Sequence, residues 1–352
     1  MGARRFYLLT LLLAALLGSA PALAERQLAD MSGRLLTLPD TVQRVYAIGH
    51  CIPVVAAVAP HKLANNYRLG ERALALLAPA LREGKVMPAQ GMRFSDEEIV
   101  TMAPDLIVME AMPGAGERAD RLQEKLKIPV LLIEQDLRDF KRTFHLLGEV
   151  LGEPAQAQVL ADFVATYLDP IPQLAKRIAP AQRKRVYYAE GPDGLSTNPA
   201  GSSHTQVLDF VGGVNVAQVA NLPDEGMSSV SLEQIYVWQP DLILVWTPAA
   251  EQATTWTAIV DNPLWQRVEA VRSGRVVQIP WLPYSWFDRP PGSNRILGVI
   301  WLAELLYPEV YHFDLEAVTR EYFSTFYHRE PSAEEVRALL ALSRPQAGRA
   351  TP

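Results

Sequence analysis

The chain has 352 residues, a formal net charge of −6, 49% hydrophobic residues and a single cysteine. An acidic balance without a Lys- or Arg-rich stripe argues against nucleic acid as a partner, and one cysteine excludes an internal disulfide. A chain of this length buries roughly 75% of its unfolded surface and normally divides into domains, so burial alone can stabilise it.

The first 24 residues have the pattern of an export signal. Arg4 and Arg5 precede an apolar run at 8–17, and Ala22-Leu23-Ala24 has the small residues of a cleavage site. That run is too short for a stable membrane anchor, and no second long apolar segment follows. Cys51 lies too far inside the chain to carry a lipid at the cleavage point. We expect cleavage after residue 24 and a free, unlipidated monomer in the periplasm.

Strand and helix patterns alternate in the next segment. Short strands are predicted at 44–48, 85–87, 106–109 and 130–133, and residues 27–38 predict an edge hairpin. Helices are predicted at 52–58 and after Ser95, which forms a capping-box pattern with Glu98. Alternating strands and helices indicate a parallel sheet, with ligand groups at the carboxyl ends of its strands.

The pattern then becomes wholly helical before strands return. Residues 137–178 carry apolar side chains at helical spacing, which predicts a long helical connector with a local break at Gly152 and Pro154. The later elements are predicted as strands at 184–188, 241–245 and 275–279, a helix at 204–211, a loop into a helix at 287–307 and a helical tail at 321–342. The predicted domains are an N-terminal lobe at 25–137, a connector at 138–180, a C-terminal lobe at 181–345 and a disordered tail at 346–352.

Two stretches 136 residues apart are nearly the same. Their alignment places Glu97 on Glu233, and Pro104-Asp105-Leu106-Ile107 on Pro240-Asp241-Leu242-Ile243. Each copy predicts a helix that ends before a Pro-Asp turn, because proline restricts the residue ahead of it, and then a buried strand. Two distant copies do not suit a stacked solenoid. They indicate two related α/β lobes with a ligand cleft between them.

Together with the segment at 283–295, PYSWFDRPPGSNR, this pattern resembles the substrate-binding proteins of ABC importers for iron-siderophores, haem and cobalamin. The resemblance covers nearly the whole mature chain. It implies an α/β fold of two Rossmann-like lobes with parallel central sheets, joined by a single long connecting helix. It also implies that one glutamate on each lobe binds arginine pockets on the two permease subunits. By position in the repeat, these are Glu97 and Glu233.

The two glutamates also make physical sense as a pair. Exposed carboxylates bind arginine forks well, and a two-subunit partner needs matched contacts on two lobes. A glutamate in a first helical turn is favoured by the helix dipole in any protein, which would explain either residue alone. Both glutamates occupy the same position in the two copies of the repeat, and this favours a role for the pair in docking on the permease.

Candidate ligand contacts follow the predicted strands or lie in the 283–295 segment. Arg93 and Arg289 are the strongest, because guanidinium groups and aromatic faces suit a large, flat, anionic ligand such as a siderophore or haem. A surface ion pair explains either arginine equally well, and core packing explains Trp246. Tyr284 and Trp286 lie in a proline-flanked loop and are harder to assign to the core. The predicted ligand-binding set is Arg93, Arg289, Tyr284, Trp286, His50, Arg68, Met92, Trp246 and His204.

The six histidines form no close pair and no His-rich loop. Capture of bare zinc or manganese needs several converging His and carboxylate ligands, so a metal already held by a chelator is expected instead. His50 and His204 occupy matching places in the two lobes, and either could supply one ligand to the metal. A capping or core histidine is the commoner alternative.

No catalytic motif is recognisable. Ser202 lacks the flanking glycines of a nucleophile elbow, and the turn Gly191-Pro192-Asp193-Gly194 has no phosphate-loop lysine beside it. We expect no enzyme and no covalent cofactor, and we hypothesise a periplasmic receptor that delivers an Fe3+ siderophore to an ABC permease dimer. Haem, cobalamin, a nickel or other metal chelate, and a sensor that does not transport remain alternatives.

Overall fold

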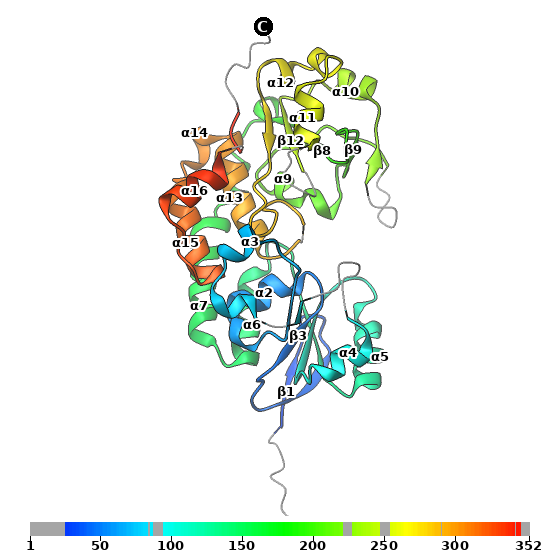
Figure 1. Cartoon of the computed structure of the whole chain (residues 1–352), viewed down its shortest axis with the longest axis vertical. Helices are drawn as coiled ribbons and strands as arrows, with labels where there is room; N and C mark the ends of the chain where they lie inside the picture. Colours follow the sequence, from blue (N-terminus) through cyan, green and yellow to red (C-terminus); the bar gives the residue numbers. More distant parts are fainter. Residues whose placement is uncertain are drawn as a thin grey trace, which may run out of the picture.

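The computed structural model describes residues 25–83, 85–86, 94–220, 227–246, 254–289, 291–341 and 343–345. Two α/β lobes lie one above the other, and the connector and the C-terminal helices run along one side of both (Figure 1). The predicted two-lobed α/β fold is therefore confirmed. The expected signal peptide at 1–24 and the expected tail at 346–352 lie outside the described residues.

The N-terminal lobe is built on a three-stranded parallel sheet of order β3-β6-β7. Val45 pairs with Leu106, and Ile107 pairs with Val130. Its strands are almost wholly buried, which is typical of a parallel sheet covered on both faces. The elements of this lobe are β1 (Glu25–Ala29), β2 (Leu35–Pro39), β3 (Val45–Ala47), α2 (Cys51–Val58), η1 (Pro60–Lys62), β4 (Asn65–Asn66), α3 (Glu71–Ala75), η2 (Pro79–Arg82), β5 (Lys85–Val86), α4 (Asp96–Thr101), β6 (Leu106–Glu110), α5 (Ala115–Leu126) and β7 (Val130–Ile133). The antiparallel β1–β2 pair is the predicted edge hairpin.

The connector consists of successive helices rather than one uninterrupted helix. Helix α6 (Phe140–Leu151) packs against α7 (Pro154–Phe163), which continues through the π-helical turn η3 (Val164–Leu168) towards α8 (Ile171–Ala175). The break falls where the sequence predicts it. Gly152 has a φ of +70°, which glycine adopts without a Cβ penalty, and Pro154 opens α7, where a missing N–H costs nothing.

The C-terminal lobe repeats the parallel design with the strand order β10-β8-β12-β13. Tyr187 of β8 pairs with Ile243 of β12, which pairs in turn with Val276 of β13. The elements of this lobe are η4 (Pro180–Gln182), β8 (Arg185–Ala189), β9 (Ser196–Thr197), η5 (Ser203–Thr205), α9 (Gln206–Phe210), β10 (Val214–Asn215), β11 (Ser228–Ser229), α10 (Leu232–Trp238), β12 (Leu242–Val245), α11 (Thr254–Val260), η6 (Trp265–Arg267), α12 (Glu269–Arg272) and β13 (Val276–Gln278).

The last four helices of the described residues are α13 (Asn294–Leu306), α14 (Pro308–Tyr311), α15 (Leu315–Tyr327) and α16 (Ala333–Leu340). The predicted continuous tail at 321–342 is therefore two helices. The first ends at Tyr327, and the next residue, His328, has a left-handed φ of +53°. Helix α15 packs against α2 and α7, so the last part of the chain also covers the first lobe and the connector.

The internal repeat persists in the backbone. Helices α4 and α10 each begin with a capping box, of Ser95 with Glu98 and of Ser231 with Gln234. Each is followed by a non-glycine residue of left-handed conformation directly before the proline, namely Ala103 with φ +46° and Gln239 with φ +39°. The two copies therefore share even an unfavourable local conformation.

The repeated aspartate has a defined structural role. Asp105 Oδ2 accepts a hydrogen bond from the backbone N–H of Arg44 at 2.8 Å, and Asp241 Oδ2 accepts one from Arg185 at 2.8 Å. Each carboxylate thus joins the start of an inner strand of the sheet to the start of its neighbour, β6 to β3 and β12 to β8. The Pro-Asp motif fixes these strand starts in both lobes.

Candidate functional site

Each lobe presents one histidine held by a carboxylate. His50 is the N-cap of α2, and its Nδ1 lies 3.2 Å from Oε2 of Glu110 at the carboxyl end of β6. His204 lies in η5 directly before α9, and its Nδ1 lies 2.7 Å from Oδ1 of Asp288. The imidazole side chains are 28% and 36% exposed. A carboxylate on Nδ1 orients the ring and makes Nε2 the nitrogen available to a metal.

Arg289 is fixed in position by its neighbours. Its Nη2 donates to Oε1 of Glu190 at 2.8 Å, and its guanidinium carbon lies 4.7 Å from the ring centroid of Trp246. Its Nε lies 3.4 Å from Oδ2 of Asp288, and both carboxylate side chains have no exposed surface. Arg289 itself is 30% exposed. A guanidinium held on one edge and stacked on a ring can offer its remaining donors to an anion.

Glu190 follows β8 and is a buried carboxyl with two partners. Asn198 Nδ2 donates to its Oε2 at 2.7 Å, and Arg289 binds the other oxygen. Burial raises the pKa of the Glu190 carboxyl, and the hydrogen bond from Arg289 opposes that rise. The charge of Arg289 therefore helps to keep this carboxyl ionised.

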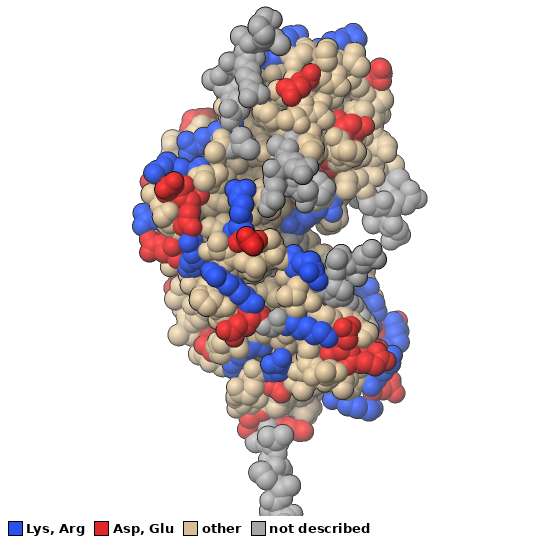
Figure 2. Space-filling model, in the orientation of Figure 1, with Lys and Arg blue, Asp and Glu red and all other residues tan. Residues whose placement is uncertain are grey.

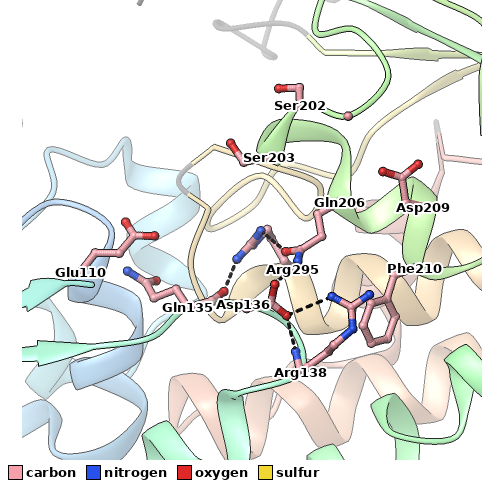
Figure 3. Close-up of a pocket in the computed structure, with 11 residues that line it drawn as sticks. Glu110, Gln135, Asp136, Arg138, Ser202, Ser203, Gln206, Asp209, Phe210 and Arg295 are labelled. Atoms are coloured by element: carbon pink, nitrogen blue, oxygen red, sulfur yellow. Dashed lines mark hydrogen bonds and ion pairs between the residues drawn. The ribbon is translucent and has the colours of Figure 1, made fainter. Parts of the chain in front are cut away.

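A cavity of about 460 Å³ lies between the lobes. Its wall from the N-terminal lobe follows the ends of β6 and β7, and its opposite wall is the segment around η5 and α9, with the first turn of α13 beside them (Figure 3). The lining residues are Glu110, Gln135, Asp136, Arg138, Gly201, Ser202, Ser203, Gln206, Asp209, Phe210 and Arg295. The volume falls within the range of small-molecule sites. Figure 2 shows the hollow between the lobes on the side away from α15 and α16, with basic side chains at its inner edge.

Tyr284 and Trp286 lie in the core, which corrects the expectation that they line an open cleft. Trp286 is 0% exposed, and its Nε1 donates to the carbonyl of Leu282 at 3.1 Å. Tyr284 is 6% exposed and meets the ring of Tyr67 edge-on at 5.9 Å. The proline-rich segment is not a free loop, because it folds back against α2.

The other predicted contacts have different outcomes. His50, His204, Arg289 and Trp246 belong to the arrangement described above, whereas Arg68 is exposed. Met92 and Arg93 lie outside the described residues.

Several polar groups of the site were not predicted from the sequence. They are Glu190, Asp288, Gln135, Asp136, Gln206 and Arg295. Two carried a usable signal, since Glu190 directly follows a predicted strand and Asp288 precedes Arg289.

The two glutamates of the repeat are both exposed, in the first turns of α4 and α10. These helices lie on different lobes but on the same side of the molecule, opposite α15 and α16 (Figure 1). A hydrogen bond from its own backbone N–H lowers the pKa of Glu233. One exposed glutamate is therefore present in each lobe, in the first turn of a helix, and the two helices lie on the same side of the molecule.

Among the residues that the structure describes, no group of three or more His, Cys, Asp and Glu side chains is arranged to hold a metal ion. Within the same residues, no helix has the length and apolar character needed to cross a membrane.

Comparison with known proteins identifies the family. The family model for periplasmic binding proteins matches residues 39–281. The molybdate-binding protein MolA of Haemophilus influenzae is 25% identical over 347 residues, 90% of this chain and 96% of that protein. A vitamin B12-binding protein of Salmonella choleraesuis is 29% identical over 211 residues, 59% of this chain and 70% of its own length. The solved ABC transporter solute binding protein from Sulfurospirillum deleyianum has a TM-score of 0.81 and 27% identity, covering 90% of this chain and 99% of that one. The chain belongs to the periplasmic binding protein family, the solute receptors of ABC importers.

Proposed function

We propose that this chain captures an anionic metal chelate, foremost a ferric siderophore, in the periplasm and delivers it to an ABC permease. The supporting observation is the pair of histidines on opposite lobes, each with Nδ1 on a carboxylate, at 3.2 Å for His50 and 2.7 Å for His204. This is the orientation in which proteins present Nε2 to a metal. One or two imidazoles fill only part of a coordination shell, so a chelator would supply the remaining ligands.

Arg289 supplies the complementary charge. Its guanidinium is pre-positioned by Glu190 and stacked on Trp246, so little side-chain entropy is lost when it binds an anionic oxygen. A ferric complex of catecholate or hydroxamate type carries such oxygens on its surface. Arg289 would bind the chelator while an imidazole completes the metal's shell.

Delivery would use Glu97 and Glu233. Both are exposed, they occupy equivalent positions in the repeat, and their helices α4 and α10 lie on the same side of the molecule, which suits a permease of two subunits with paired arginine pockets. We also propose that residues 1–24 are cleaved and that the mature protein works as a monomer.

A second candidate ligand is an oxoanion such as molybdate. A relative that matches 90% of this chain is named for binding it. An oxoanion would use Arg289 and neighbouring polar groups without needing an imidazole as a metal ligand.

Ligand titration separates the two candidates. Quenching of tryptophan fluorescence and native mass spectrometry would be run with hexadentate ferric siderophores, tetradentate ferric siderophores, haem, cobalamin, a nickel chelate and molybdate. The tetradentate complexes leave coordination positions open. We expect them to bind to the wild type and to lose about tenfold or more in affinity, about 1.4 kcal/mol or more, in His50→Gln or His204→Gln. Hexadentate complexes, whose shell is complete, are the matched control and should be affected less.

The outcomes are distinct. Binding of molybdate with no ferric chelate bound would replace the first candidate by the second. Equal losses for tetradentate and hexadentate complexes would remove metal coordination from the proposal. Recovery of the bound chelate unchanged after release would support a receptor, whereas a modified chelate would indicate an enzyme.

A further inference from the structure

One glutamine links the two lobes across the cavity. Gln206 opens α9 in the C-terminal lobe, and its Nε2 donates to Oδ2 of Asp136, just beyond β7 in the N-terminal lobe, at 2.6 Å. Its Oε1 accepts from Nη1 of Arg295 at 2.9 Å. Arg295 also donates through Nη2 to the backbone carbonyl of Gln135, so it contacts both lobes (Figure 3). We call the side chains of Arg295, Gln206 and Asp136 the interlobe relay.

The relay has only one consistent arrangement of donors and acceptors. A guanidinium only donates, and an ionised carboxylate only accepts. The amide of Gln206 therefore has to turn its oxygen to Arg295 and its nitrogen to Asp136, and rotating it by 180° would break both bonds. Both bonds involve a charged group, which places them in the stronger class of hydrogen bonds.

The two ends of the relay are themselves fixed. Arg295 is 4% exposed, and burial lowers the pKa of its guanidinium. Burying a cation is energetically unfavourable unless its N–H groups are hydrogen-bonded, so the hydrogen bonds of Arg295 to its acceptors are strongly favoured. At the other end, Asp136 Oδ1 accepts from the backbone N–H of Arg138 at 2.9 Å, which leaves Oδ2 directed to Gln206. The Arg138 guanidinium also lies 5.5 Å from the ring centroid of Phe210, a second contact between the lobes.

We infer that Gln206 is a positioning residue that holds the two lobes at a fixed separation and so determines which ligand sizes the cleft admits. The inference does not depend on the ligand proposed above. It depends on the relay joining the walls of one cavity, because lengthening the bond between Gln206 and Asp136 moves these walls apart.

The test measures the distance between the lobes by double electron–electron resonance on the full mature chain. Spin labels would be attached through Val100→Cys on α4 and Val237→Cys on α10, which are 53% and 83% exposed. Cys51 is 0% exposed and would stay unlabelled. The distance distribution would be recorded without ligand.

Two variants break the relay in different ways. Gln206→Glu sets a second carboxylate against Asp136, and Gln206→Met keeps the length but removes both hydrogen bonds without adding charge. We expect both to shift and broaden the distribution, with the population at distances longer than the wild-type distance raised about tenfold or more relative to that at the wild-type distance, since each loses a hydrogen bond to a charged group.

A compensating change tests the relay itself. In Gln206→Glu with Asp136→Asn, the glutamate accepts from Arg295 and from Nδ2 of Asn, while Oδ1 of Asn still accepts from the backbone of Arg138. The narrow wild-type distribution should return. Asp136→Asn alone should itself broaden the distribution, because its amide nitrogen would face the amide nitrogen of Gln206, and two donors cannot bond.

The matched control is Gln158→Glu. Gln158 Nε2 donates to Oδ1 of Asp162 at 2.8 Å within one helix. The control substitution therefore removes the same kind of amide–carboxylate hydrogen bond but affects no contact between the lobes. This control should leave the distribution unchanged, and circular dichroism would show that every variant is folded. A wild-type distribution in both Gln206→Glu and Gln206→Met overturns the inference, and so does a broadening that the double variant fails to reverse.

Discussion

Replacing Arg289 by methionine should destabilise the protein in a way that depends on pH. The substitution keeps the length of the side chain but removes the guanidinium that lies 2.8 Å from Glu190 Oε1 and 3.4 Å from Asp288 Oδ2. Asp288 keeps His204 as a partner, whereas Glu190 keeps the uncharged amide of Asn198 as its side-chain partner among the described residues. The Glu190 carboxylate would then be a buried charge without a counter-ion.

The expected cost follows from burial. Removing one partner of a buried ion pair costs about 3–5 kcal/mol, and because Arg289 is 30% exposed we expect the lower end, about 3 kcal/mol, at pH 8. Glu190 has a pKa that burial already raises, and loss of Arg289 should raise it further. A carboxyl whose folded-state pKa lies above its unfolded value contributes stability at low pH and loses it as the pH rises through the folded value. The deficit of the variant should therefore shrink between pH 8 and pH 5, by about 1.4 kcal/mol for each pH unit of additional rise in the pKa of Glu190.

Urea unfolding at pH 5, 6, 7 and 8 would measure this deficit as a change in midpoint at constant slope. The matched control is Arg267→Met, because Arg267 is exposed and its guanidinium carbon lies 4.5 Å from the ring centroid of Tyr236. It should cost about 1 kcal/mol or less at every pH. A deficit in Arg289→Met that stays constant across the pH range would refute the assignment of the cost to Glu190.

Three further predictions concern other parts of the chain. Gly298→Ala should destabilise the protein by about 3 kcal/mol or more in thermal or urea unfolding, because a Cβ there would lie 1.6 Å from the carbonyl oxygen of Trp286; a loss below about 1 kcal/mol would contradict the packing of α13. Ser231→Ala removes the capping box of α10 and should cost about 1 kcal/mol, with Ser231→Thr largely restoring it. Changing both Glu97 and Glu233 to alanine should abolish ligand-stimulated ATPase activity of the reconstituted permease and leave ligand affinity intact; weakened ligand binding would instead place these carboxylates in the cleft.

Most of the fold could be predicted because the internal repeat allows one half of the chain to be compared with the other. The repeat located α4 with β6 and α10 with β12, and the apolar runs located the strands. Even the connector break followed from Gly152 and Pro154, whose local preferences act without help from distant residues.

The site was harder to predict because its contacts join distant segments. Whether the segment around Trp286 is a loop or core depends on contacts such as that of Ser293 Oγ with the carbonyl of Pro53, at 3.2 Å and 240 residues apart. The partners of Arg289 and Gln206 likewise depend on how the lobes meet. Local sequence patterns carry no information about such pairings.

Helix α15 lies late in the sequence but packs against helices that are synthesised much earlier. Its Phe326 meets Phe144 of α6 and Phe163 of α7 edge-on, at 5.8 Å and 5.2 Å between ring centroids, and so completes the packing of connector helices that are synthesised much earlier. We expect the packing around α6 and α7 to be completed only after α15 has been synthesised, since contacts of such long sequence separation form late. For a protein that works in the periplasm, this delay would prolong the interval in which the nascent chain can still be threaded through a translocation channel.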